Sequence, residues 1–126
     1  MDIYRQKILD HYKNPKNFGK IEKPDAFFEE GNALCGDRIG MGIKVTKLET
    51  GNWKLEDVKF NGEGCAISMA SASMLTEKVK GINLEEIKKL RYEDIKKMMG
   101  TELSPARIKC ATLPLQVLQK TVGLIK

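Results

Sequence analysis

The spacing of apolar residues changes once along this chain, at Cys65, and this change constrains the fold more than any other feature. Before it, Met41, Ile43 and Val45 alternate with polar or small residues, which is typical of a strand with one buried face. After it, residues 65–80 are apolar or small around most of the helical circumference, which indicates a helix buried on most sides. Antiparallel strands followed by helices favour the α+β class.

Caps and phase shifts divide the rest of the chain. Gly81 and Gly100 are expected to end two helices, and a shift of apolar phase between Leu55 and Val58 predicts a β-bulge. The pattern predicts one domain over residues 1–126, in which a small antiparallel three-stranded sheet is covered by helices on one face. The expected elements are a helix over 2–13, strands over 26–30, 41–46 and 53–61, a long helix over 65–80, a short helix after Asn83, and helices over 92–99 and 113–125. Ser104-Pro105 also has the sequence of a helix start, with Ser as the cap and Pro at the first position.

The charge pattern argues against nucleic acid as the main partner. The formal net charge is +5, but most lysines alternate with glutamate or aspartate, as in residues 84–89, and no aromatic–basic signature accompanies them. No run of about 18 apolar residues occurs, and the N-terminal residues lack the apolar core of a signal peptide. We therefore expect a cytoplasmic protein that binds neither nucleic acid nor a membrane.

The chain contains three cysteines, Cys35, Cys65 and Cys110. An odd number of cysteines without an export signal argues against a disulfide framework. Metal binding or thiol chemistry is the leading alternative.

Each cysteine lies where a side chain can be exposed and aimed. Cys35 lies in a turn between two expected strands, and Cys65 opens the long apolar helix, whose N-terminal end favours a thiolate. Cys110 lies between Pro105 and Pro114, at the expected entry to the last helix. Because loop and helix-start positions can meet at one end of a domain, we expect the three thiols to converge there.

Three thiolates leave one position of a tetrahedral metal site open, and Asp37 is the best-placed residue to fill it. Two other interpretations stay open on spacing alone, because no cysteine pair has the C-x-x-C arrangement. Asp37 can be a turn residue whose side chain bonds the backbone, and each cysteine can be a small buried hydrophobe. His11, the only histidine, is expected to be packed or at the surface rather than a ligand.

Four blocks of the sequence, in order and spread over nearly the whole chain, resemble the signature blocks of the IscU/SufU/NifU N-terminal family. The blocks are residues 11–19 (HYKNPKNFG), 32–37 (NALCGD), 64–77 (GCAISMASASMLTE) and 107–113 (RIKCATL). The resemblance implies a scaffold that receives sulfide from a cysteine desulfurase and iron from a donor. Such a scaffold assembles a transient [2Fe-2S] cluster and passes it to apo iron–sulfur recipient proteins.

The resemblance also implies the ligands. They fall on Cys35, Cys65 and Cys110, with Asp37 near the metal, and the same site is expected to hold zinc when the protein is isolated. No catalytic residue is implied, because the scaffold is a carrier without turnover of its own. A carboxylate in place of a fourth thiolate is expected to make the cluster more labile, which suits a cluster that has to be released.

The sequence departs from both branches of this family. Lys109 stands where IscU-type members carry a histidine, and residues 103–107 differ from the segment that a dedicated Hsp70 chaperone recognises, so the sequence does not support that partnership. The lysine at position 109 resembles the SufU branch. Two roles stay open for it: a surface substitution, or a group that enters the site beside Cys110. Cys65 and Cys110, however, are 45 positions apart, which resembles the shorter IscU spacing, whereas SufU proteins carry an extra segment.

A second function therefore stays open. In the SufU-like alternative the chain is a zinc-dependent sulfurtransferase, in which Zn²⁺ lies on the same four residues and one cysteine leaves the metal to accept persulfide sulfur from a desulfurase. A purely structural zinc site is a third alternative, although structural zinc favours closed sets of cysteine and histidine.

Overall fold

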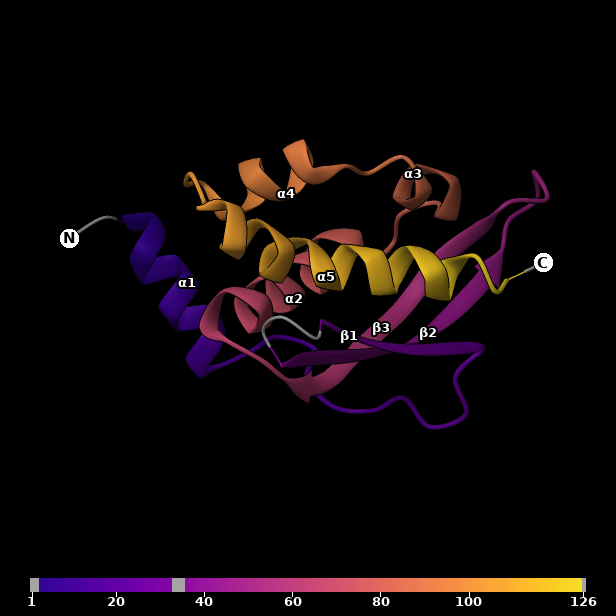
Figure 1. The fold of residues 1–126 in the computed structure, drawn as a ribbon. Coiled ribbons are helices and arrows are strands. Elements are labelled where there is room, and N and C mark those ends of the chain that lie inside the picture. Colours follow the sequence, from indigo (N-terminus) through magenta and orange to yellow (C-terminus); the bar gives the residue numbers. More distant parts are fainter. Residues whose placement is uncertain (1–2, 33–35, 126) are drawn as a thin grey trace.

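The computed structural model describes residues 3–32 and 36–125 (Figure 1). The elements are α1 (Ile3–Lys13), β1 (Ala26–Asn32), β2 (Asp37–Lys47), β3 (Trp53–Glu63), α2 (Ala66–Val79), α3 (Leu84–Lys88), α4 (Tyr92–Met99) and α5 (Pro105–Val122). This order confirms the predicted α+β class. Among the described residues, no helix is long and apolar enough to cross a membrane.

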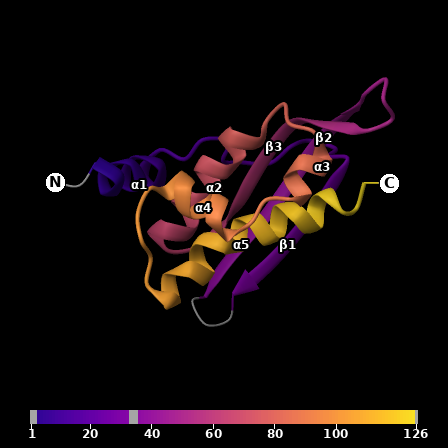
Figure 2. The same ribbon diagram turned by 90° about the horizontal axis from the view of Figure 1, so that it is seen from above.

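The three strands form one antiparallel sheet in the order β1-β2-β3. The side chains of Ile39, Met41 and Ile43 on β2 are completely buried, and α2 and α5 pack over the sheet. Figures 1 and 2 show these helices on one face, while the segment between α1 and β1 passes along the other side in Figure 1. The predicted sheet with helices on one face is therefore confirmed.

Helix α2 occupies the centre of the molecule, in contact with α1, α4, α5 and β3. Residues 68–76 and Val79 are buried, which confirms a helix enclosed on most sides. Gly81 follows the helix with φ +84°, one position beyond the C-cap residue Lys80 rather than at the cap itself.

The β-bulge expected between Leu55 and Val58 is present. Lys44 pairs with Asp57 and Val45 pairs with Leu55, so Glu56 is the extra residue of β3. The bulge restores the burial of Leu55 and Val58 on the same face, which the apolar pattern required.

Two expected boundaries were wrong, and both concern the site. β2 begins at Asp37 rather than Met41, because Arg38 and Ile39 already pair with the end of β3. The alternation of apolar residues in fact continues back to Ile39, with Gly40 at a small-residue position, so the sequence pattern allowed the earlier start.

The last helix begins at Pro105 with Ser104 as its N-cap residue, which confirms the helix start expected there, whereas the start expected near residue 113 was wrong. Pro114 lies inside it, although proline is rarely tolerated there because it removes one N–H from the helix. The carbonyl that Pro114 cannot reach is that of residue 110, four positions earlier. The Ser71 hydroxyl of α2 donates to the next carbonyl, that of Ala111, at 2.6 Å and so joins α2 to this part of α5. Cys110 therefore lies within a continuous helix.

Candidate metal centre

Three side chains from three different elements meet at one end of the sheet. Asp37 begins β2, Cys65 precedes α2, and Cys110 lies in the second turn of α5. One ligand atom of each, a carboxylate oxygen or an Sγ, lies within 4.8 Å of the others. The structure thus brings together three of the four residues expected to converge. Cys35 lies outside the described residues.

Asp37 is almost completely buried, with 3% of its surface exposed. Its Oδ1 accepts a hydrogen bond from the Cys65 backbone N–H at 3.0 Å, and its Oδ2 lies 3.8 Å from the Cys65 Sγ. Asp37 is a strand residue paired with Asn32, so the alternative of a turn residue bonding its own turn is not what the structure shows.

Cys65 is the N-cap residue of α2. Its Sγ accepts a hydrogen bond from the Ser68 backbone N–H at 3.5 Å, as a serine or aspartate oxygen does at other helix starts. A negative charge on sulfur is favoured at this end of a helix by the unpaired N–H groups and the helix dipole. The expected helix-start position of Cys65 is confirmed.

Cys110 is buried, with 1% of its surface exposed. Its Sγ lies 3.7 Å from the Ala106 carbonyl oxygen one turn earlier. The expected position at the entry to the last helix was wrong, because α5 begins at Pro105 and Cys110 lies in its second turn. The thiol nevertheless reaches the site, since the first turns of α5 pass over the end of the sheet where Asp37 lies.

Two glycines that the sequence analysis did not single out allow β3 to approach this site. Gly62 has φ +137°, and a Cβ there would lie 1.9 Å from the Arg38 carbonyl oxygen, so only glycine fits. A Cβ on Gly64 would lie 3.0 Å from Asp37 Oδ1. The sequence signal for this close approach was the pair of glycines within the three residues that precede Cys65.

The remaining candidates lie away from the cluster. His11 shares a 2.7 Å hydrogen bond between its Nδ1 and the Ser73 hydroxyl of α2, which agrees with a packed histidine. Burial lowers the pKa of His11 below its ordinary value of 6.5, against the opposing effect of Glu77. Lys109 is exposed, as the surface interpretation of this residue requires.

The donor set suits a thiophilic metal. Around a tetrahedral ion with bonds of about 2.0 to 2.3 Å, ligand atoms lie roughly 3.5 to 3.8 Å apart, and the separation of Cys65 Sγ and Asp37 Oδ2 is 3.8 Å. Thiolates bind zinc, iron and iron–sulfur clusters, and a carboxylate completes such sets. The residues present therefore fit either a zinc ion or a cluster.

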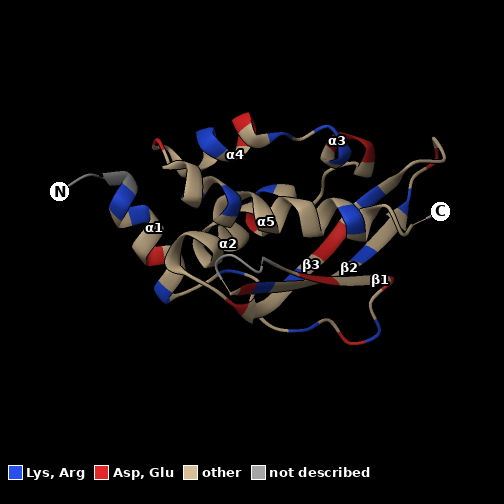
Figure 3. Cartoon of the chain, in the orientation of Figure 1, with Lys and Arg blue, Asp and Glu red and all other residues tan. Residues whose placement is uncertain are grey.

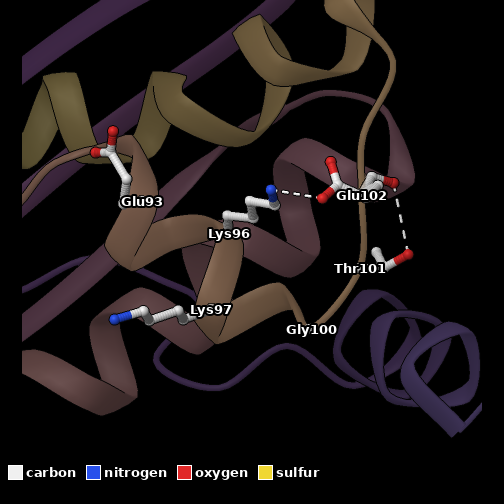
Figure 4. A pocket seen from close by; sticks show the side chains of 6 residues that line it. All are labelled: Glu93, Lys96, Lys97, Gly100, Thr101 and Glu102. Atoms are coloured by element: carbon white, nitrogen blue, oxygen red, sulfur yellow. Dashed lines mark hydrogen bonds and ion pairs between the residues drawn. The ribbon is translucent and has the colours of Figure 1, made fainter.

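A separate pocket of about 440 Å³ lies between α4 and the residues that follow it (Figure 4). It is lined by Glu93, Lys96, Lys97 and residues 100–102, and Lys96 forms an ion pair with Glu102 across it. That ion pair raises the pKa of Lys96. None of these residues belongs to the cluster of Asp37 and the cysteines.

The comparisons with known proteins agree in one family. A model described as the NifU-like N-terminal domain matches residues 3–125. The zinc-dependent sulfurtransferase SufU of Bacillus subtilis is 41% identical, with 96% of this chain and 90% of that protein aligned. The iron–sulfur cluster assembly scaffold protein IscU 1 of Archaeoglobus fulgidus is 35% identical over 95% of this chain and 74% of that protein. The alignment with SufU spans 138 positions, more than the 126 residues here, so SufU carries residues that this chain lacks.

A solved structure shares the fold. The crystal structure of a putative iron–sulfur cluster assembly scaffold protein for the SUF system from Fervidobacterium islandicum AW-1 superposes with a TM-score of 0.78. It is 28% identical, and the match covers 93% of this chain and 94% of that one. The resemblance read from the four sequence blocks is confirmed.

Proposed function

Because this chain belongs to the NifU-like N-terminal domain family, we propose that it is a scaffold on which a [2Fe-2S] cluster is assembled and from which it is transferred. The observation that carries the proposal is the convergence of Asp37, Cys65 and Cys110 within 4.8 Å. Cys35, which the sequence places two residues before Asp37, is the proposed fourth ligand. The IscU relatives, named as scaffold proteins, support this role.

The residues of the site have separate tasks in this proposal. Cys65 and Cys110 supply sulfur ligands, and the α2 N-terminus favours the negative charge that the cluster and its thiolates bring. Asp37 supplies an oxygen ligand that is weaker for iron than a thiolate, so the cargo is easier to release. Burial of Asp37 and Cys110 limits access of water to the bound cluster.

The proposed partners follow from the chemistry. A cysteine desulfurase supplies the sulfide, an iron donor supplies iron, and apo iron–sulfur proteins receive the cluster. We propose no dedicated Hsp70 partnership, because residues 103–107 lack the recognition segment. We place the protein in the cytoplasm, because thiols that bind metal need a reducing compartment.

The second candidate is a zinc-dependent sulfurtransferase. The SufU relative at 41% identity and Lys109 beside Cys110 favour it, and the same donor set accepts Zn²⁺. In this case one cysteine leaves the zinc and its thiolate attacks the outer sulfur of the desulfurase persulfide. The sulfur moves to that cysteine, and the desulfurase cysteine leaves as a thiolate.

One experiment separates the two. The protein is purified without oxygen, its zinc and iron are measured, and desulfurase, cysteine and ferrous iron are then supplied. A [2Fe-2S] absorption spectrum and transfer to an apo-ferredoxin support the scaffold. Stoichiometric zinc that persists, strong stimulation of the desulfurase and no cluster would overturn the scaffold in favour of the sulfurtransferase.

A matched pair of variants ties the result to the site. Cys65→Ala should lose the cluster, because it removes a ligand. His11→Gln should keep it, because the only histidine of the chain lies against Ser73 and not in the cluster. Loss of the cluster in His11→Gln would show that the ligand set is wrong.

A further inference from the structure

The hydroxyl of Ser68 stands out among the buried polar groups of α2. Ser71 and Thr76 donate to backbone carbonyls, and the Ser73 hydroxyl bonds to two partners in the N-terminal part of the chain. Ser68 is equally buried, with 0% exposed, yet its Oγ has no hydrogen-bond partner within the described residues. Buried hydroxyls are nearly always paired, so a native exception calls for an explanation.

The location of this hydroxyl supplies one. Ser68 lies one turn after Cys65, and its backbone N–H donates to the Cys65 Sγ. Its Oγ and the Oδ1 of Asp37 both lie 3.0 Å from the point where a Cβ of Gly64 would stand. The glycine therefore leaves a small space that the Asp37 carboxylate and the Ser68 hydroxyl border together, beside the metal centre.

Loading the site changes what Asp37 can bond. In the structure, Oδ2 of Asp37 lies 3.8 Å from the Cys65 Sγ, a contact in which the thiol is the donor. If both atoms ligate one metal ion, each is directed at the metal rather than at the other. A ligating carboxylate normally receives hydrogen bonds from neighbouring groups that fix its orientation. Among the residues that the structure describes, Ser68 is the buried hydroxyl beside Asp37 that has no partner.

We propose that Ser68 is a positioning residue whose hydroxyl donates a hydrogen bond to the Asp37 carboxylate when the site holds metal. The inference rests on the proposed function and deepens it. It assigns to Ser68 a hydrogen bond that supports the Asp37 ligand, which the family blocks do not specify. The Ser68 hydroxyl, which has no partner among the described residues of the metal-free protein, then donates its hydrogen bond only in the metal-bound protein. Gly64 keeps the space open through which the two side chains meet.

The test uses zinc and cobalt alone, without desulfurase or iron. Ser68→Ala should weaken Zn²⁺ binding by about tenfold or more, measured by competition with a chromophoric chelator. It should also shift the visible spectrum of the Co²⁺ form, because the orientation of the Asp37 ligand changes. Unchanged zinc affinity together with an unchanged cobalt spectrum would overturn the proposal.

The stability of the metal-free protein gives a second measurement. Ser68→Ala is expected to weaken zinc binding but not to lower this stability. Ser68→Ala removes an unsatisfied buried hydroxyl, so the metal-free variant should be as stable as the wild type or more stable. The matched control is Ser73→Ala on the same helix, which removes a partnered hydroxyl. It should lower stability and leave zinc affinity unchanged. If Ser68→Ala destabilises the metal-free protein as Ser73→Ala does, the role of Ser68 is structural and the proposal fails.

A double-mutant cycle shows whether Ser68 acts through Asp37. In an Asp37→Ala background, Ser68→Ala should no longer change zinc affinity, because the carboxylate that it supports is gone. A full tenfold effect in that background would contradict the proposal. Failure of the proposed function looks different: wild-type zinc binding would then be indifferent to Asp37→Ala and Cys65→Ala alike.

Discussion

Asp37 is a carboxylate that is 97% buried, in a chain where most acidic residues are exposed. The bond from the Cys65 N–H to Oδ1 holds it at the start of β2, and Oδ2 is directed to the thiol of the same cysteine. A buried carboxylate that accepts one backbone bond and faces two sulfurs is suited to bind a cation. Its weaker bond to iron is the proposed source of cluster lability.

Replacement of Asp37 by alanine tests that role. Asp37→Ala should lengthen the lifetime of the bound cluster and slow its transfer to an apo-ferredoxin, because it removes the oxygen ligand that is proposed to make the cluster labile. Transfer is followed by the change in visible circular dichroism as the cluster moves. Asp25→Ala is the matched control, since Asp25 also accepts a backbone N–H, from Val45, but lies outside the site. Equal transfer rates in wild type and Asp37→Ala would count against the account.

His11 carries a prediction about pH. Burial lowers its pKa below 6.5 in the folded protein, so the folded state favours the neutral ring and unfolding takes up a proton below that pH. The contribution of His11 to the free energy of unfolding should therefore be fully present above pH 6.5, and it should be lost as the pH falls below that value. Urea unfolding of the metal-free protein at about pH 7.5 and about pH 5.5 measures this.

The control for this prediction is His11→Gln. It keeps a polar partner for Ser73 but has no group that titrates in this window, so its stability should change less between the two pH values. Identical pH dependence in the variant and the wild type would assign the effect to other groups.

At the scale of single residues, the sequence named three residues of the candidate site that the structure brings together, Asp37, Cys65 and Cys110. Asp37 and Cys65 were found because an acidic residue after Cys-Gly and a cysteine at a helix start both have a chemical reason to lie there. Ser68 was not found. A serine in an apolar helix looks like any small packing residue, and only the three-dimensional arrangement shows that its hydroxyl lacks a partner.

At the scale of elements, the connection from β3 to α2 sets the geometry of the site. Gly62 lets the end of β3 lie against the Arg38 carbonyl, and Cys65 then begins α2 directly beside Asp37. Helix α5 brings Cys110, the third side chain of the cluster, from the other end of the chain. The site thus depends on three junctions between elements rather than on one loop.

Replacement of Gly62 tests the importance of this junction. Gly62→Ala places a Cβ 1.9 Å from a backbone oxygen and forces a strained φ, so it should lower the free energy of unfolding by about 3 kcal/mol. Gly51→Ala is the control, because Gly51 also has positive φ but no atom within 4 Å of its Cβ position. It should cost only about 1 kcal/mol. Equal losses, measured by urea unfolding, would show that the close approach does not matter.

Element types were predictable where periodicity was strong, as in α2 and the β2–β3 hairpin with its bulge. The start of the last helix was misplaced for a different reason. The apolar spacing of residues 115–125 predicted a helix only from about residue 113, whereas α5 begins at Pro105. Ser104 and Pro105 carried the local signal for this start, and the helix continues through Pro114.

At the scale of the whole molecule, charge is distributed without one dominant patch in the orientation of Figure 3, where basic and acidic residues alternate along the elements. The family resemblance covers residues 3–125, so the scaffold fold, and not an appended segment, positions the site. That whole-chain match is why the family could be recognised from four short blocks.

The iron and acid-labile sulfide that the protein holds after anaerobic reconstitution test the central claim most directly. The account predicts that wild-type protein binds iron and sulfide in equal amounts with a [2Fe-2S] spectrum. It also predicts that Cys65→Ser and Cys110→Ser each lose most of both, while Ser73→Ala retains them. Wild-type cluster content that survives in both cysteine variants would contradict the claim that Asp37, Cys65 and Cys110 form the cluster site.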